Sequence, residues 1–214
     1  AFLKAFESYV NANIPVIYIG IGSKFSGTFN SALTALNMLD TDLVHLIDSE
    51  NLSSGSGLLL LKAGEMIKKG DDVKVIVDTI QSLVPKVRSQ FVIDTLDYLH
   101  KGGRINGLQN LMGSMLKLKP IIKVIDGEMA VGKKTRGHIK NGVKLLLSDL
   151  LDQIESVDDS FVMITHSLAP DMAQTIKEAL DEKAYFKHIY ETQAGCVISS
   201  HCGKGTIGIL YLMK

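Results

Sequence analysis

Apolar residues in the first half of the chain follow two periodicities in turn. Nearly continuous apolar runs at 16–21 and 43–47 are typical of strands buried on both faces. Around them, apolar residues recur every three or four positions, as in amphipathic helices. These predicted helices lie at about 1–11, 28–39, 56–69 and 71–83. Strands that alternate with helices indicate βαβ units, in which a parallel sheet carries helices on both faces.

After residue 88 the pattern changes. Asp126-Gly127 between two apolar runs is a strong signal for a two-residue hairpin, which does not belong to a purely parallel sheet. The other predicted strands lie near 91–93, 161–165, 186–191, 196–200 and 207–212. One helix is predicted directly after the first of these strands and ends at Gly102-Gly103. Further helices are predicted at about 107–116, 138–154 and 170–182. We therefore expect a second lobe with a mixed sheet.

The fold class predicted from these patterns is α/β with two tightly packed lobes. Residues 1–88 are expected to form a parallel-sheet, Rossmann-like α/β/α domain, and residues 89–214 an α/β domain with a mixed sheet. A chain of 214 residues, 46% of them hydrophobic, can bury a core of this size.

Composition narrows the classes of partner. Lys plus Arg equals Asp plus Glu at 23 each, so net charge gives no general attraction to nucleic acid or to an anionic membrane surface. The longest apolar run, 57–61, is far too short for a membrane span, and we expect no stable membrane insertion. Cys196 and Cys202 form neither a CxxC pair nor half a zinc site. We expect a reducing compartment, the cytoplasm, and no metal.

The turn "GSKFSGT" at 22–28 joins a strand to a helix, where free backbone N–H groups and the helix dipole favour an anion. It misses the dinucleotide pattern GxGxxG, because the third glycine would fall at Phe25. It matches the glycines of a nucleotide-triphosphate loop at Gly22 and Gly27 but lacks the lysine that follows them. A carboxylate or a single phosphate suits the hydroxyls of Ser26 and Thr28 better. Helix capping by either hydroxyl explains the local sequence equally well.

Two other glycine-rich segments carry candidate binding groups. Arg104 in "KGGRI" and Arg136 in "KKTRG" project guanidinium groups from turns, and arginine suits bidentate recognition of a carboxylate or phosphate. His201 follows an apolar run and precedes "CGKG", although a lone histidine is more often structural. Ser167 is not in a GxSxG nucleophile elbow.

Six segments, in order and spanning almost the whole chain, resemble the DegV family of bacterial lipid-binding proteins, which have the EDD fold. They are "GSKFSGTFNSA" at 22–32, "VHLIDSENLSSGSGLLLLKA" at 44–63, "FVIDTLDYLHKGGRI" at 91–105, "GSMLKLKPII" at 113–122, "DGEMAVGKKTRG" at 126–137 and "HCGKGTIGI" at 201–209. The resemblance implies a long-chain fatty acid, similar to palmitate or oleate, bound between two lobes, with no other cofactor. It also implies that a separate fatty acid kinase, in at least some members, phosphorylates the bound carboxyl group.

The resemblance assigns roles residue by residue. Ser26 matches the serine that contacts the carboxylate, and the helix start at Gly27 and Thr28 supplies amides beside it. His201 matches the histidine of the family's "HTGxG" turn. Arg104 and Arg136 match arginines of the family, the second of which lies near the head group. No catalytic residue is implied, since the resemblance is to a lipid carrier.

The sequence departs from the family pattern at three places. Gly22 replaces a common serine, which we expect to be harmless, and Cys202 replaces a threonine, whose hydroxyl is a better hydrogen-bond donor. The family's initial "TDS" and "TSQP" motifs are not in this sequence, so we expect that an N-terminal segment is missing. Two alternatives remain open: a phosphoryl- or acyl-transfer enzyme that uses Ser26 and His201, and a binding module for another small carboxylate or sugar phosphate.

Overall fold

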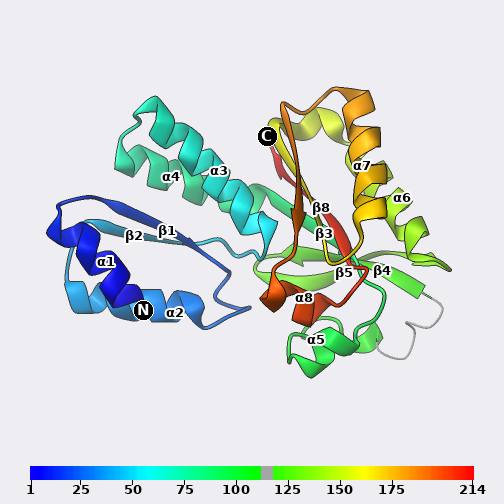
Figure 1. Cartoon of the computed structure of the whole chain (residues 1–214), viewed down its shortest axis with the longest axis horizontal. Helices are drawn as coiled ribbons and strands as arrows, with labels where there is room; N and C mark the ends of the chain where they lie inside the picture. The colour runs from blue at the N-terminus through cyan, green and yellow to red at the C-terminus, as the bar shows by residue number, and fades with distance from the viewer. Residues whose placement is uncertain (112–117) are drawn as a thin grey trace.

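The computed structural model describes residues 1–111 and 118–214 and contains two β-sheets (Figure 1). The first is a parallel pair, β1 (Val16–Gly20) and β2 (Val44–Asp48). The strands of the second are β3 (Val87–Val92), β4 (Leu118–Ile125), β5 (Glu128–Arg136), β6 (Val157–His166), β7 (His188–Gln193) and β8 (Ile207–Met213). Their order is β5-β4-β3-β8-β6-β7, and only β6 and β7 pair in parallel. The predicted α/β class with a mixed second sheet is confirmed.

Helices cover both faces of the first sheet, as the apolar strands require. The helices are α1 (Phe2–Asn11) and α2 (Thr28–Leu39) on one face, and α3 (Ser54–Lys69) and α4 (Val73–Leu83) on the other. Because side chains alternate along a strand, Val16 and Tyr18 pack with α1 and α2, whereas Ile17 and Ile19 pack towards α3.

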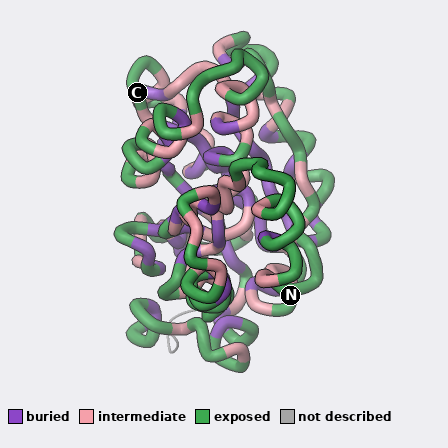
Figure 2. The backbone as a smooth tube through the Cα atoms, turned by 90° about the vertical axis from the view of Figure 1, so that its left-hand side faces the viewer, coloured by how far each residue is buried: buried purple, intermediate pink, exposed green. Residues whose placement is uncertain are grey.

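Helix α3 also packs against the second sheet. Its buried Leu58 and Leu59 share one apolar cluster with Ile47 of β2 and with Phe161 and Leu210 of β6 and β8. This cluster joins residues of both sheets. Buried residues lie towards the inside of the molecule, while exposed residues occupy turns and the outer sides of helices (Figure 2). Helix α3 belongs to the first predicted domain but contacts strands of both sheets. The division into domains 1–88 and 89–214 therefore stays a prediction.

The opposite face of the six-stranded sheet is covered by α6 (Ile139–Leu151) and α7 (Pro170–Lys183) (Figure 1). Gly142 of α6 lies directly on β3, since a Cβ atom at this position would come within 2.3 Å of the Val92 side chain. Two short helices, α5 (Asp97–Lys101) and α8 (Cys196–Cys202), pack against each other near the carboxyl ends of β3 and β7. Among the described residues, no helix has both the length and the apolar character needed to cross a membrane.

The predicted hairpin is confirmed and one predicted strand is wrong. Asp126 and Gly127 have φ values of 51° and 75° between β4 and β5, as a type I′ turn requires. The predicted strand at 196–200 is instead helix α8. Its β-branched residues favour a strand, but tertiary packing overrides this weak preference. Of the helix predicted at 107–116, residues 112–116 lie outside the described part, and Gln109–Leu111 form a 3₁₀ turn.

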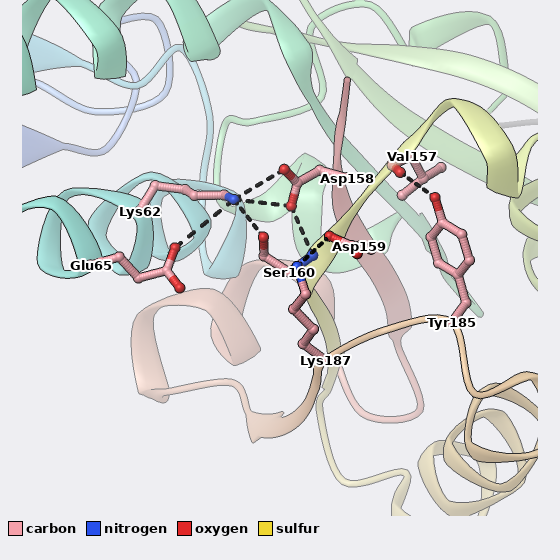
Figure 3. Close-up of polar contacts among 8 residues, drawn as sticks. All are labelled: Lys62, Glu65, Val157, Asp158, Asp159, Ser160, Tyr185 and Lys187. Carbon is pink, nitrogen blue, oxygen red and sulfur yellow. Dashed lines mark hydrogen bonds and ion pairs between the residues drawn. The ribbon is translucent and has the colours of Figure 1, made fainter.

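A lysine ties α3 to the start of β6 (Figure 3). Lys62 Nζ donates to both carboxylate oxygens of Asp158 at 3.0 Å and to Ser160 Oγ at 2.8 Å, and lies 5.4 Å from the centre of the Phe161 ring. Burial raises the pKa of the Asp158 carboxyl, but hydrogen bonds from the Ser160 amide and from Lys62 outweigh it. The net pKa is lower than the ordinary value.

A closed ring of three hydroxyls ties the first turn of α3 to β6 and β7. Thr165 Oγ1 donates to Ser54 Oγ at 2.6 Å, and Thr192 Oγ1 lies 2.8 Å from Thr165 Oγ1 and 3.1 Å from Ser54 Oγ. Each hydroxyl can donate to one neighbour and accept from the other, so the ring satisfies its own buried polar atoms.

We expect Lys62→Met to lower the free energy of unfolding by about 1 kcal/mol at pH 7, since partial exposure screens the lost pair. The folded-state pKa of Asp158 is lowered, so its contribution is present above the unfolded-state pKa and is lost as pH falls through the folded-state pKa. The difference from the unmodified protein should therefore shrink below about pH 4. Urea unfolding of the variant and of the unmodified protein, at pH 7 and below about pH 4, measures this difference in the free energy of unfolding. Lys187→Met, which breaks the exposed pair with Asp159, is the matched control. An equal loss in both variants, or one independent of pH, would contradict the assignment.

We expect Thr165→Val and Ser54→Ala to be non-additive, because each substitution opens the same hydroxyl ring. Each should lower the free energy of unfolding by about 1–2 kcal/mol, and the double variant should lose less than the sum of the two. Chemical denaturation of the four proteins in the cycle measures the coupling. Strictly additive losses would mean that the three hydroxyls do not act as one unit.

Candidate functional site

A cavity of about 190 Å³, the central cavity, lies where the first turn of α2 meets α8 and the loop after α5. Four of the six residues predicted as head-group ligands line it: Ser26, Thr28, Arg104 and His201. The remainder of its lining is apolar apart from Cys202, and includes Phe25, Leu52, Phe91, Met129 and Ile198.

Two further cavities adjoin the central one. The outer cavity, of about 270 Å³, shares Phe25, Ser26, Arg104 and Met129 with it. It adds glycines, Gly27 among them, and the polar residues Ser23, Lys24, Asn106 and Glu128. The inner cavity, of about 50 Å³, shares Leu52, Phe91, Ile198 and Cys202 with it. Gly27 thus lies at the outer cavity. Arg136 is exposed at the end of β5 and is not among the described residues that line any of the three.

The turn that carries Ser26 is held by backbone contacts. Gly22 N–H donates to the carbonyl of Asn51 at 2.7 Å, and Ser23 N–H donates to the Asp48 carboxylate at 3.2 Å. A Cβ atom at Gly22 would come within 3.0 Å of the Asn51 nitrogen, so the close approach favours glycine. The next turn then delivers Gly27 as the residue before α2.

Ser26 combines a local contact with free donors beside it. Its Oγ lies 2.8 Å from Thr28 Oγ1 and accepts weakly from the Thr28 amide at 3.3 Å. In the part of the chain that the structure describes, the amides of Gly27 and Phe29 have no acceptor, and no acidic or imidazole side chain hydrogen-bonds to Ser26. Helix capping and anion binding are compatible here, because the first amides of a helix outnumber the capping groups.

Two cationic side chains, one from each lobe, hold this turn against the second lobe. Arg104 donates from Nε to the Phe25 carbonyl at 3.4 Å and from Nη1 to the Gly102 carbonyl at 2.7 Å. Lys24 Nζ donates to the carbonyl of Asp126 at 2.9 Å, at the tip of the β4–β5 hairpin. Both cations lie at the outer cavity, where Lys24 also pairs with Glu128 at 3.6 Å. Two cations and one carboxylate leave an excess positive charge, which favours an anion.

His201 lies in the last turn of α8, and the geometry of its ring selects a tautomer. Nδ1 is buried with no hydrogen-bond partner among the described residues, and a Cβ atom at Gly102 would lie 2.0 Å from it. A proton on Nδ1 would therefore be a buried donor without an acceptor, which is costly. The proton belongs on Nε2, which leaves that nitrogen as the donor that a ligand in the central cavity can use.

The inner cavity is mainly apolar although several of its residues carry hydroxyls, and three of these hydroxyls bond to other protein groups. Ser89 Oγ donates to Asn51 Oδ1 at 2.6 Å, Thr165 belongs to the hydroxyl ring, and Thr206 donates to the Cys202 carbonyl at 2.8 Å. Burial raises the pKa of the Cys202 thiol, so this side chain is a neutral, weakly polar part of the wall.

The three cavities therefore change from polar and cationic outside to apolar inside. This arrangement suits an amphiphile with one anionic end. No group of His, Cys, Asp or Glu within 1–111 and 118–214 could hold a metal ion. The apolar wall residues Leu52, Phe91 and Ile198 were not predicted as site residues. In the sequence, the four-residue spacing of Ile198 and Cys202 is compatible with one face of a helix, and this spacing is a signal for the wall formed by α8.

Comparison with known proteins agrees with this fold. The family model described as "Uncharacterised protein, DegV family" matches residues 1–214. A DegV domain-containing protein of Caldanaerobacter subterraneus subsp. tengcongensis is 33% identical over 213 residues, which cover 100% of this chain and 76% of that relative.

Two solved structures show the same architecture. A fatty-acid-binding DegV family protein from Thermus thermophilus is 24% identical with a TM-score of 0.91, over 100% of this chain and 76% of its own. A stearic acid-binding protein from Eubacterium ventriosum is 24% identical with a TM-score of 0.84, over 100% of this chain and 75% of its own. At these identities the structural likeness concerns the fold. Because the family model matches its whole length and a relative shares a third of its residues, this chain belongs to the DegV family.

Proposed function

We propose that this protein binds a long-chain fatty acid, similar to palmitate or oleate, and carries it without performing chemistry on it. The carboxylate lies at the neck between the outer and central cavities. Its donors are the hydroxyls of Ser26 and Thr28, the amide of Gly27, Nε2 of His201 and the guanidinium of Arg104. The acyl chain follows the central cavity towards the inner one. A structurally similar DegV protein is described as fatty-acid-binding, and a second structurally similar protein as stearic acid-binding, which supports the ligand class.

The single observation that carries the proposal is the order of the three cavities. Polar and cationic groups gather at the outer end, and hydroxyls at the inner end are bonded to protein partners. A sugar phosphate or a short carboxylate gains little from an apolar inner end. A fatty acid gains about 0.8 kcal/mol for each buried methylene, so a dozen methylenes supply most of the affinity. The donors at the neck then offset the desolvation of one carboxylate.

We further propose that the bound carboxylate is presented to a separate fatty acid kinase for acyl-phosphate formation. The outer cavity supports this step, because it continues beyond the carboxylate position and carries the cations of Lys24 and Arg104. A phosphoryl group added to the carboxylate increases its negative charge, and these cations stabilise that charge. Arg136 has no assigned contact with the head group, since it lies at the far end of β5.

Organic extraction of the purified protein followed by mass spectrometry should yield a straight-chain fatty acid of about 16–18 carbons. A chain of this length has at least the dozen methylenes whose burial, at about 0.8 kcal/mol each, supplies most of the affinity. Delipidated protein should take up added palmitate or oleate. Recovery of no fatty acid, together with no uptake of either probe, would contradict the proposed function.

Ser26→Ala should weaken fatty-acid binding by about 1–3 kcal/mol, because it removes a hydrogen bond to a charged group. Titration of delipidated protein with a fluorescent fatty acid measures the change. Ser31→Ala on the same helix is the matched control, since the Ser31 hydroxyl bonds only to the Gly27 carbonyl at 3.2 Å. If both variants keep the unmodified affinity, Ser26 is a helix cap and not a ligand.

A further inference from the structure

A second, separate cavity of about 380 Å³ lies where β4 diverges from β3. The two strands pair only between residues 90–92 and 121–123. Beyond Lys123 the β4–β5 hairpin turns towards the first lobe, where the Asp126 carbonyl accepts from Lys24 at 2.9 Å. The gap left beside β3 is the β3–β4 cavity, and none of the residues that line it lines the central cavity.

Strand register places four polar side chains on one face of this gap. Arg88 and Gln90 are two residues apart on β3, so they project to the same face. Gln90 is paired with Lys123 of β4, and Arg88 with Tyr211 of β8. Residues paired directly across antiparallel strands also share a face. Two cations, an amide and a phenol therefore line one wall.

Neither cation of this wall has a carboxylate partner in the described part of the chain. Arg88 donates from Nη1 to two carbonyls, of Pro85 at 2.9 Å and of Val87 at 3.2 Å, which leaves its other guanidinium nitrogens available. The Lys123 ammonium has no hydrogen bond or ion pair within 1–111 and 118–214. The Lys123 side chain leans towards β5, since a Cβ atom at Gly132 would come within 2.9 Å of its Cε atom. Cationic groups without a bonded carboxylate in a concave site attract an anion.

The buried polar groups behind this wall are also incompletely bonded. Tyr211 OH accepts from Gln90 Nε2 at 2.7 Å and from Gln153 Nε2 at 2.9 Å, and Gln90 Oε1 has no partner among the described residues. If the Gln90 amide is turned over, its nitrogen loses its acceptor instead. One polar atom of Gln90 is unsatisfied either way, and buried polar groups are rarely left so. Burial raises the pKa of Tyr211 to about 12, so at neutral pH the phenol keeps its proton.

Two carboxylates, of Glu50 and Asp126, also line the cavity, and neither has an ion-pair partner among the described residues. They can accept hydrogen bonds from hydroxyl groups of a ligand whose anionic end faces Arg88 and Lys123. The volume of the cavity lies in the range of small-molecule sites, about 300–1,000 Å³. The pair of cations matches the double charge of a phosphate monoester.

We propose that the β3–β4 cavity is a second ligand site, which binds a small hydroxylated phosphate monoester with its phosphate on Arg88 and Lys123. The site lies beside the fatty-acid site: it shares no lining residue with the central cavity, but Ser89 also lines the inner cavity and Gly127 also lines the outer cavity. Its ligand is small and water-soluble, in contrast to an acyl chain.

Ribose 5-phosphate is the probe, and isothermal titration of the whole chain measures binding. The expected dissociation constant is about 1 mM or tighter. Ribose, which lacks the phosphate, should not bind, and inorganic phosphate should bind more weakly because it lacks hydroxyl groups for Glu50 and Asp126. Arg88→Gln and Lys123→Met should each weaken ribose 5-phosphate binding about tenfold or more. Lys144→Met, on the exposed side of α6, is the matched control and should change nothing.

Protection from lysine acetylation tests the same site in the unmodified protein, so the result does not depend on how well a variant folds. Ribose 5-phosphate should slow acetylation of Lys123 relative to Lys144, as peptide mass spectrometry measures. Absence of binding, or equal affinity in Arg88→Gln, Lys123→Met and the unmodified protein, overturns the proposal. The second result would place the phosphate elsewhere, for example at the cations of the outer cavity.

Discussion

Helix α3 lies between the two sheets, and its apolar side chains contact both. Leu58 and Leu59 are fully buried against strands of each sheet, and complete burial of such a side chain contributes about 1.5–3 kcal/mol. Because the helix is fixed at this junction, the turn before it is fixed as well. That turn places Leu52 in the wall shared by the central and inner cavities. The position of the binding site thus follows from one packing contact.

The same kind of side chain has opposite roles at the two ends of the site. At the outer end, the Ser26 turn presents a hydroxyl and free amides beside two cations. At the inner end, hydroxyls of Ser89, Thr165 and Thr206 are bonded to protein acceptors, so their carbon atoms form the wall. Polarity of the cavity is therefore decided by hydrogen-bond partners more than by residue type.

Local patterns in the sequence predicted the elements whose signals are local. The strand–turn–helix around Ser26 and the Asp126-Gly127 hairpin depend on glycine positions and short apolar runs, and both were confirmed. Helix α8 was predicted as a strand, because Val197 and Ile198 favour strands and only tertiary packing makes the segment helical. Leu52 and Phe91 could not be recognised as wall residues, since their meeting depends on how the lobes pack. For the same reason, only the family resemblance predicted that Arg104 and His201 lie in one site. Nothing in the sequence indicated that Arg136 lies away from the lining of the three cavities.

The ring formed by Ser54, Thr165 and Thr192 has a consequence for wetting of the molecule's interior. Each of its three hydroxyls can donate its proton to a neighbour in the ring, so the hydroxyl of Thr165, the member that lines the inner cavity, has no free proton for a water molecule there. A stable buried water needs two or more polar partners, and an apolar space of this size stays dry without them. The closed ring thus removes one hydroxyl donor from the wall of the inner cavity, and opening the ring would return that donor to the wall.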